Sequence, residues 1–121
     1  MSNHKFVHVE LSSKDQAAMK KFYDAVFGWE FQDFPDMGDY TTFTTGEGEM
    51  GGGFNPVSDD NPPGNIVLYI HTDDLAGTRA KIQAGGGMIL MDDMDIPTVG
   101  TMSIFKDPSD NVIALLQPVE M

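Results

Sequence analysis

Apolar and polar residues alternate along several short segments of the chain, and such alternation is typical of half-buried strands. In the first of these segments, residues 6–11, Phe6, His8 and Glu10 fall on one face and the aliphatic residues fall on the other. The same period predicts three further strands in the first half of the chain, at residues 29–34, 40–45 and 50–54.

A helical pattern separates the first two predicted strands. Ser13 is the expected N-cap, because Gln16 stands three residues later and would complete a capping box. Gly28 is the expected end of the helix, in the left-handed conformation. Apolar residues recur between them at helical spacing and predict one face that packs on a sheet, formed by Met19, Phe22, Tyr23 and Val26.

The same order of elements repeats after a polar linker at residues 57–64. A strand is predicted at residues 65–70, and Asp73 or Asp74 can cap a helix that runs to about Ala84. Three more strands complete the second half, at residues 88–91, 101–106 and 112–117.

The element order predicts an α+β fold of two tandem βαβββ modules, at about 5–56 and about 65–119. The modules are expected to form a cupped mixed sheet around a central cavity, with the helices outside and residues 1–121 as a single domain. A few polar groups among apolar ones on the inner strand faces predict a small-molecule pocket. The expected lining residues are His8, Glu10, Asn65, Val67 and Tyr69.

Two further features bear on this pocket. The glycine-rich run at residues 46–53 lacks the Lys-Ser/Thr end of a phosphate loop, so its glycines are expected to let backbone approach closely and to leave room in the cavity. Methionines cluster in the second half, and one or two of them are expected to line an adaptable wall of the pocket. These are Met88, Met91, Met94 and Met102.

Composition narrows the possible functions. The chain has no cysteine, which excludes disulfides, thiolate metal sites and a cysteine nucleophile. Its net charge of −12 argues against binding to nucleic acid or to anionic membranes. No apolar run approaches the roughly 20 residues of a membrane span, and no secretion signal is recognisable at the start. A cytoplasmic location is therefore expected.

Five short segments, taken in order, make the chain similar to the vicinal oxygen chelate superfamily. This superfamily includes glyoxalase I, bleomycin-resistance proteins and extradiol dioxygenases, and the chain resembles its small glyoxalase-like members most. The resemblance covers nearly the whole chain. It rests on Val7-His8-Val9-Glu10-Leu11, Phe22-Tyr23, Phe27-Gly28-Trp29, Thr72-Asp73-Asp74-Leu75, and Asp107-Pro108 with Asn111.

The resemblance also implies where a metal would be bound. Enzymes of the superfamily usually hold a divalent metal with His, Glu or Gln from the first and last strands of each half. The matching positions here are His8, Asn65, one residue within 51–53, and Ala114. Glycine and alanine have no ligating side chain and asparagine is a poor ligand for transition metals, so only His8 is a strong ligand. No cofactor is expected, and a divalent metal is the alternative.

These observations leave three hypotheses of function. The first is metal-independent binding of a small molecule in a cavity lined by the residues above and by Ala114, with precedent in the bleomycin-resistance proteins. The second is a divergent lyase or isomerase that uses His8 and Glu10, with or without a divalent metal. The third is a structural module whose own side chains fill the cavity. A homodimer is a further expectation, because superfamily members often pair their halves across subunits.

Overall fold

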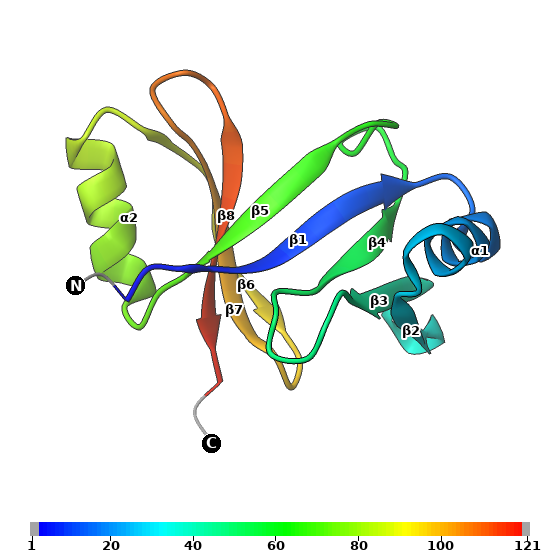
Figure 1. Cartoon of the computed structure of the whole chain (residues 1–121). Helices are drawn as coiled ribbons and strands as arrows, with labels where there is room; N and C mark the ends of the chain where they lie inside the picture. Colours follow the sequence, from blue (N-terminus) through cyan, green and yellow to red (C-terminus); the bar gives the residue numbers. More distant parts are fainter. Residues whose placement is uncertain (1–2, 120–121) are drawn as a thin grey trace. The chain divides into compact units, whose positions relative to one another are not determined.

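The computed structural model describes residues 3–119, which divide into two compact units (Figure 1). The first unit comprises His8–Val67, and the second comprises the residues up to Val7 together with those from Leu68 onward. None of the helices described is long and apolar enough to cross a membrane.

The first unit contains a four-stranded sheet with the strand order β2-β3-β4-β1. β1 and β4 pair in parallel, and the other neighbours are antiparallel, so the sheet is mixed. The elements are β1 (Phe6–Ser13), α1 (Gln16–Phe27), β2 (Glu30–Phe34), the 3-10 helix η1 (Pro35–Met37), β3 (Tyr40–Thr44) and β4 (Gly52–Pro56).

The second unit repeats this arrangement with the strand order β5-β8-β7-β6, in which β5 and β8 are the parallel pair. Its elements are β5 (Ile66–His71), α2 (Leu75–Ala84), β6 (Met88–Ile96), β7 (Gly100–Lys106) and β8 (Val112–Pro118). The predicted α+β class, with two tandem βαβββ modules in mixed sheets, is confirmed. β6 extends beyond the predicted residues 88–91 and passes through two aspartates, with shifts in its pairing register between Ile89 and Met91 and between Met91 and Met94.

The start of α1 differs from the prediction. Ser13 belongs to β1 and is buried, and the N-cap is Asp15, whose side chain accepts a hydrogen bond of 3.2 Å from the Ala18 N–H. Gln16 does not complete a capping box, because its amide donates instead to the carbonyl oxygens of Asp39 and Phe54. The predicted end at Gly28 is confirmed by its left-handed φ of 71°.

The second unit has an aliphatic core beneath α2. Leu75, Phe105 and Leu115 are buried there together, and Ile70 of β5 packs against them. Ile66, which alternation places on the same face of β5 as Ile70, is exposed. The N-cap of α2 is Asp74, which accepts a 3.0 Å hydrogen bond from the Gly77 N–H.

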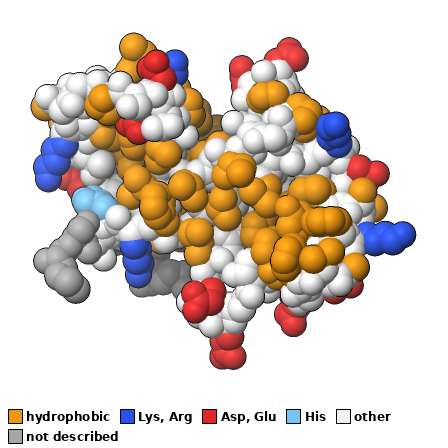
Figure 2. Space-filling view, turned by 45° about the horizontal axis from the view of Figure 1, so that its top comes forward, with side chains coloured by type: hydrophobic (Ala, Val, Ile, Leu, Met, Phe, Trp, Pro, Cys, Tyr) orange, Lys and Arg blue, Asp and Glu red, His pale blue; other side chains and the backbone are white. Residues whose placement is uncertain are grey.

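The first unit instead packs aromatic rings on the α1 side of its sheet. Trp29 lies between Tyr23 and Phe43, with ring centroids 4.7 Å and 4.8 Å away and nearly parallel planes. The predicted apolar face of α1 is only partly covered, because Phe22 and Val26 are 55% and 56% exposed. Hydrophobic side chains are correspondingly visible on the half of the surface that carries α1 (right side of Figure 2).

Candidate functional site

A short chain of polar side chains lies on the face of the first sheet opposite the aromatic rings. The Tyr40 hydroxyl lies 2.7 Å from His8 Nε2 and 2.8 Å from Glu10 Oε2. His8 Nε2 and Glu10 Oε2 are themselves 3.8 Å apart. The alternation of β1 brings His8 and Glu10 to one face, and the antiparallel β3 brings Tyr40 between them. The predicted proximity of His8 and Glu10 is therefore observed, with a phenol added.

The donors and acceptors of this chain have one consistent direction. An ionised carboxylate can only accept, so the single Tyr40 hydroxyl hydrogen is donated to Glu10. The Tyr40 oxygen must then accept from His8, which requires a hydrogen on Nε2. The resulting order is His8 Nε2–H to Tyr40 Oη–H to Glu10 Oε2.

Gly53 makes space for the Tyr40 ring. Gly53 lies opposite Glu10 in the parallel β1–β4 pair and opposite Thr42 in the antiparallel β3–β4 pair. A Cβ at this position would overlap the Tyr40 hydroxyl and Cζ. The prediction that the glycine run leaves room in a cavity is thus wrong at Gly53, because the phenol of Tyr40 fills the space that the missing side chain vacates.

Glu10 is the acceptor at the end of the chain and is only partly desolvated. Its side chain is 16% exposed and that of His8 is 26% exposed, so both can be reached from solvent. The Asn55 amide lies 3.5 Å from Glu10 Oε1, at the limit of a hydrogen bond. The cluster therefore combines a carboxylate, a phenol, an imidazole and an amide on one partly buried face.

These residues do not fit a divalent metal. His8 Nε2, which could otherwise bind a metal ion, lies 2.7 Å from the Tyr40 hydroxyl. Gly53 and Ala114 offer no ligating atom at their positions. Across residues 3–119, no three His, Asp or Glu side chains form a group that could hold a metal ion.

The remaining predicted pocket residues have different environments. Asn65 precedes β5 and is engaged locally, with its amide donating to Asn61 and its N–H to the Ser12 hydroxyl. Val67 is half-buried in the same unit. In the second unit, Tyr69 lies directly opposite Ala114 in the β5–β8 pair, and both are buried.

The sequence pattern does not reveal two members of the cluster, Tyr40 and Asn55. Both lie on predicted strands or directly beside one, but strand alternation does not reveal which strand is the neighbour. The signal that could have identified Tyr40 is the pairing of a glycine strand with a strand that begins in tyrosine, because a large ring needs a small residue opposite or beside it.

Predicted wall-lining methionines share one face of the second sheet. Met94 lies opposite Met102, and Met91 lies opposite Ile104, in the β6–β7 pair. Alternation along β7 puts Met102 and Ile104 on the side away from Phe105 and therefore away from α2. Met102 is buried and Met94 is exposed, so the methionines of this face extend from the interior to the surface.

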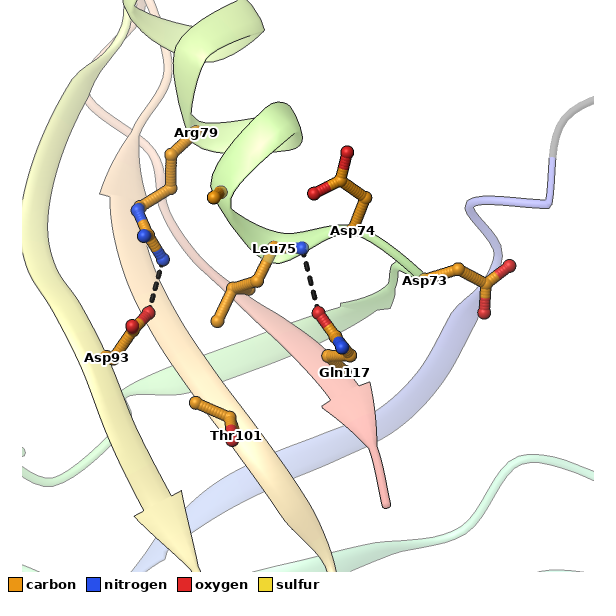
Figure 3. Close-up of a pocket in the computed structure, with 8 residues that line it drawn as sticks. Asp73, Asp74, Leu75, Arg79, Asp93, Thr101 and Gln117 are labelled. Carbon is orange, nitrogen blue, oxygen red and sulfur yellow. Dashed lines mark hydrogen bonds and ion pairs between the residues drawn. The ribbon is translucent and has the colours of Figure 1, made fainter. Parts of the chain in front are cut away.

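A hollow of about 320 Å³ lies at the N-terminus of α2 (Figure 3). Its polar groups are paired with one another. The Gln117 side chain accepts from the Leu75 N–H, and Arg79 forms an ion pair with Asp93. Thr101 donates to Asp95. These contacts connect the start of α2 and strands β6, β7 and β8. We therefore assign the polar groups around this hollow a role in stability and not in ligand binding.

Comparison with known proteins identifies the family. Residues 5–115 match the model of the glyoxalase/bleomycin resistance protein/dioxygenase superfamily. A protein named "Putative glyoxylase CFP32" from Mycobacterium tuberculosis is 34% identical over 114 residues, which cover 90% of this chain and 44% of that protein. The anthracycline biosynthesis protein DnrV from Streptomyces peucetius is 30% identical, covering 88% of this chain and 44% of its own length. The chain thus spans less than half of these relatives.

Solved structures share the fold at low sequence identity. A hypothetical protein from Bacillus halodurans C-125 has a TM-score of 0.76 at 12% identity, covering 99% of this chain and 98% of its own. Methylmalonyl-CoA epimerase from Mycobacterium tuberculosis has a TM-score of 0.74 at 13% identity, covering 95% and 88%. The chain belongs to the glyoxalase/bleomycin resistance protein/dioxygenase superfamily.

Proposed function

We propose that this chain binds a small molecule without a metal ion, and that His8, Tyr40, Glu10 and Asn55 form its recognition site. The observation that carries the proposal is the Tyr40 phenol, which bonds His8 and Glu10 in the space above Gly53. The Tyr40 hydroxyl thus joins His8, the one strong ligand at the expected metal positions, to the carboxylate of Glu10.

Two chemical properties support this assignment. The cluster offers several hydrogen-bonding groups in a partly buried setting, where such contacts discriminate between ligands more strongly than in water. The side chains of Glu10 and His8 are 16% and 26% exposed, so a ligand can reach both of them from solvent. Asn65 and Val67, which lie in the same unit as this cluster, remain proposed as further lining residues.

Metal titration tests the metal-independent part of the proposal. The protein is purified without a histidine tag, and Ni²⁺, Zn²⁺, Mn²⁺ and Fe²⁺ are added in turn. We expect less than stoichiometric bound metal and no rise in Tm, in the wild type and in His8→Ala alike. Stoichiometric metal that is lost in His8→Ala would overturn the proposal.

A second candidate function is proton transfer by a divergent lyase or isomerase. The observation in its favour is the continuous path from His8 through Tyr40 to Glu10, with both steps at 2.8 Å or less. Incubation with dihydroxyacetone, a simple α-hydroxy ketone, in D2O tests it. Deuterium incorporation that is lost in Glu10→Gln and in Tyr40→Phe would favour the enzyme, and incorporation at the buffer rate would favour binding alone. Failure of all ligands to bind would favour the structural module.

A further inference from the structure

The hydrogen bonds that join His8, Tyr40, Asn55 and Glu10 to one another run toward the Glu10 carboxylate. Tyr40 donates its only hydroxyl hydrogen to Glu10 Oε2, and Asn55 makes a long contact to Oε1. His8 Nε2–H is used by Tyr40. An ionised carboxylate has about four lone-pair positions, so these two contacts leave acceptor capacity on Glu10. A ligand that reaches Glu10 therefore needs to donate a hydrogen bond.

The charges around the site point the same way. Residues 8–67 contain eleven acidic residues and three basic ones, all of them lysines. Lys20 is paired with Asp33 at 2.8 Å. Among the residues described, His8 is the only basic group whose nitrogen lies within 4 Å of the Glu10 carboxylate. An anionic ligand at this face would meet a carboxylate without an arginine or lysine to neutralise it.

We infer that the site takes an uncharged or cationic small molecule that donates a hydrogen bond to Glu10, such as a phenol, an alcohol or an amine, and rejects carboxylates, phosphates and acyl-CoA esters. This inference rests on the proposed binding function and specifies its ligand class. The repulsion between two like charges about 4 Å apart near a protein surface suffices for at least tenfold weaker binding. The shared fold with methylmalonyl-CoA epimerase therefore does not extend to a ligand that carries phosphates.

Five naphthalene derivatives test the inference, because they share one ring system and differ in a single substituent. 2-Naphthol and 2-naphthylmethylamine donate hydrogen bonds, 2-methoxynaphthalene cannot, and 2-naphthoate and 2-naphthyl phosphate are anions. Each probe is titrated into ¹⁵N-labelled full chain, and the amide shifts of Glu10, Tyr40 and Gly53 are followed. We expect the alcohol and the amine to bind more tightly than the methoxy compound, and both anions to bind at least about tenfold more weakly than 2-naphthol.

Glu10→Gln separates charge from shape, because it keeps an acceptor oxygen for Tyr40 and removes the negative charge. In this variant we expect the affinity for the anions to approach the affinity for 2-naphthol. In the wild type we expect high salt to reduce the difference between these affinities. Anions that match or exceed 2-naphthol in the wild type would overturn this inference and leave the binding function standing. If no probe shifts these amides, the proposed binding site itself fails, and the inference fails with it.

Discussion

Glu10 on β1 lies opposite Gly53 on β4 in the first unit, and Tyr69 on β5 lies opposite Ala114 on β8 in the second. In both units a small residue on the last strand pairs in parallel with a larger residue on the first strand. The third strand then adds Thr42 beside Gly53 in the first unit. In the second unit it adds an isoleucine, Ile104, beside Ala114.

The difference lies in what occupies the space above the small residue. In the first unit it is a phenol that joins an imidazole to a carboxylate, so the face is polar and partly open. In the second unit Ala114 is fully buried and lies between the buried Tyr69 and the apolar Ile104, so the space beside it is closed by packing. One position of the repeated module thus supports hydrogen bonding in one unit and packing in the other.

The largest expected effect comes from adding a methyl group at Gly53. Gly53→Ala forces Tyr40 out of its position, and overpacking of this kind costs about 2–3 kcal/mol of unfolding free energy. The matched change in the second unit, Ala114→Gly, removes a methyl group and adds backbone freedom, for about 1–2 kcal/mol. Urea unfolding of both variants measures the contrast.

A double variant shows whether the Tyr40 ring is the cause. In a Tyr40→Ala background, the methyl group of Gly53→Ala has space, and its further cost should fall below about 1 kcal/mol. An equal cost in both backgrounds would mean that the sheet itself rejects the methyl group and that Gly53 does not serve to accommodate the phenol.

A smaller effect is expected from Tyr40→Phe, which keeps the ring and removes the central hydroxyl. His8 and Glu10 each lose a hydrogen-bond partner, and we expect a cost of about 1–2 kcal/mol. Tyr23→Phe is the control on the aromatic face of the same sheet and should cost about 0.5 kcal/mol or less. Similar unfolding midpoints for the two variants would show that the polar chain contributes little to stability.

The smallest expected effect on stability concerns two carboxylates with lowered pKa values, Asp33 in the first unit and Asp107 in the second. A hydrogen bond from Lys20, and a second from Thr41, lower the pKa of Asp33. The Asn111 side chain and backbone N–H lower the pKa of Asp107. A carboxyl whose pKa is lowered in the folded state stabilises the protein when the pH is above the pKa of the same group in the unfolded chain. This stabilisation is lost as the pH falls through the lowered pKa.

Asp33→Asn and Asp107→Asn should therefore destabilise slightly near neutral pH and be nearly neutral in strong acid. Only the Asp33 contribution depends on a charged partner, so only its effect should shrink in high salt. Thermal unfolding of both variants at neutral and acidic pH, each at low and high salt, measures the pH dependence and the salt dependence of these effects. Equal salt sensitivity of the two variants would contradict the assignment of Lys20 as the main cause.

Local patterns predicted most of the fold because the forces behind them are local. Strand alternation, the left-handed Gly28 and the capping Asp74 each depend on residues that are close in sequence. The prediction of where α1 starts was wrong because of contacts between residues that are distant in sequence. Gln16 donates to the carbonyl oxygens of Asp39 and Phe54, which lie on other parts of the unit, and Asp15 caps the helix instead.

For the site, the period of β1 determined that His8 and Glu10 share a face, and the absence of ligating side chains at Gly53 and Ala114 follows directly from their chemistry. Only the tertiary structure decided that Tyr40 lies between His8 and Glu10. That contact joins strands about thirty residues apart and depends on β3 pairing with a glycine in β4. No local preference encodes which strands become neighbours, because pairing depends on the packing of the whole sheet.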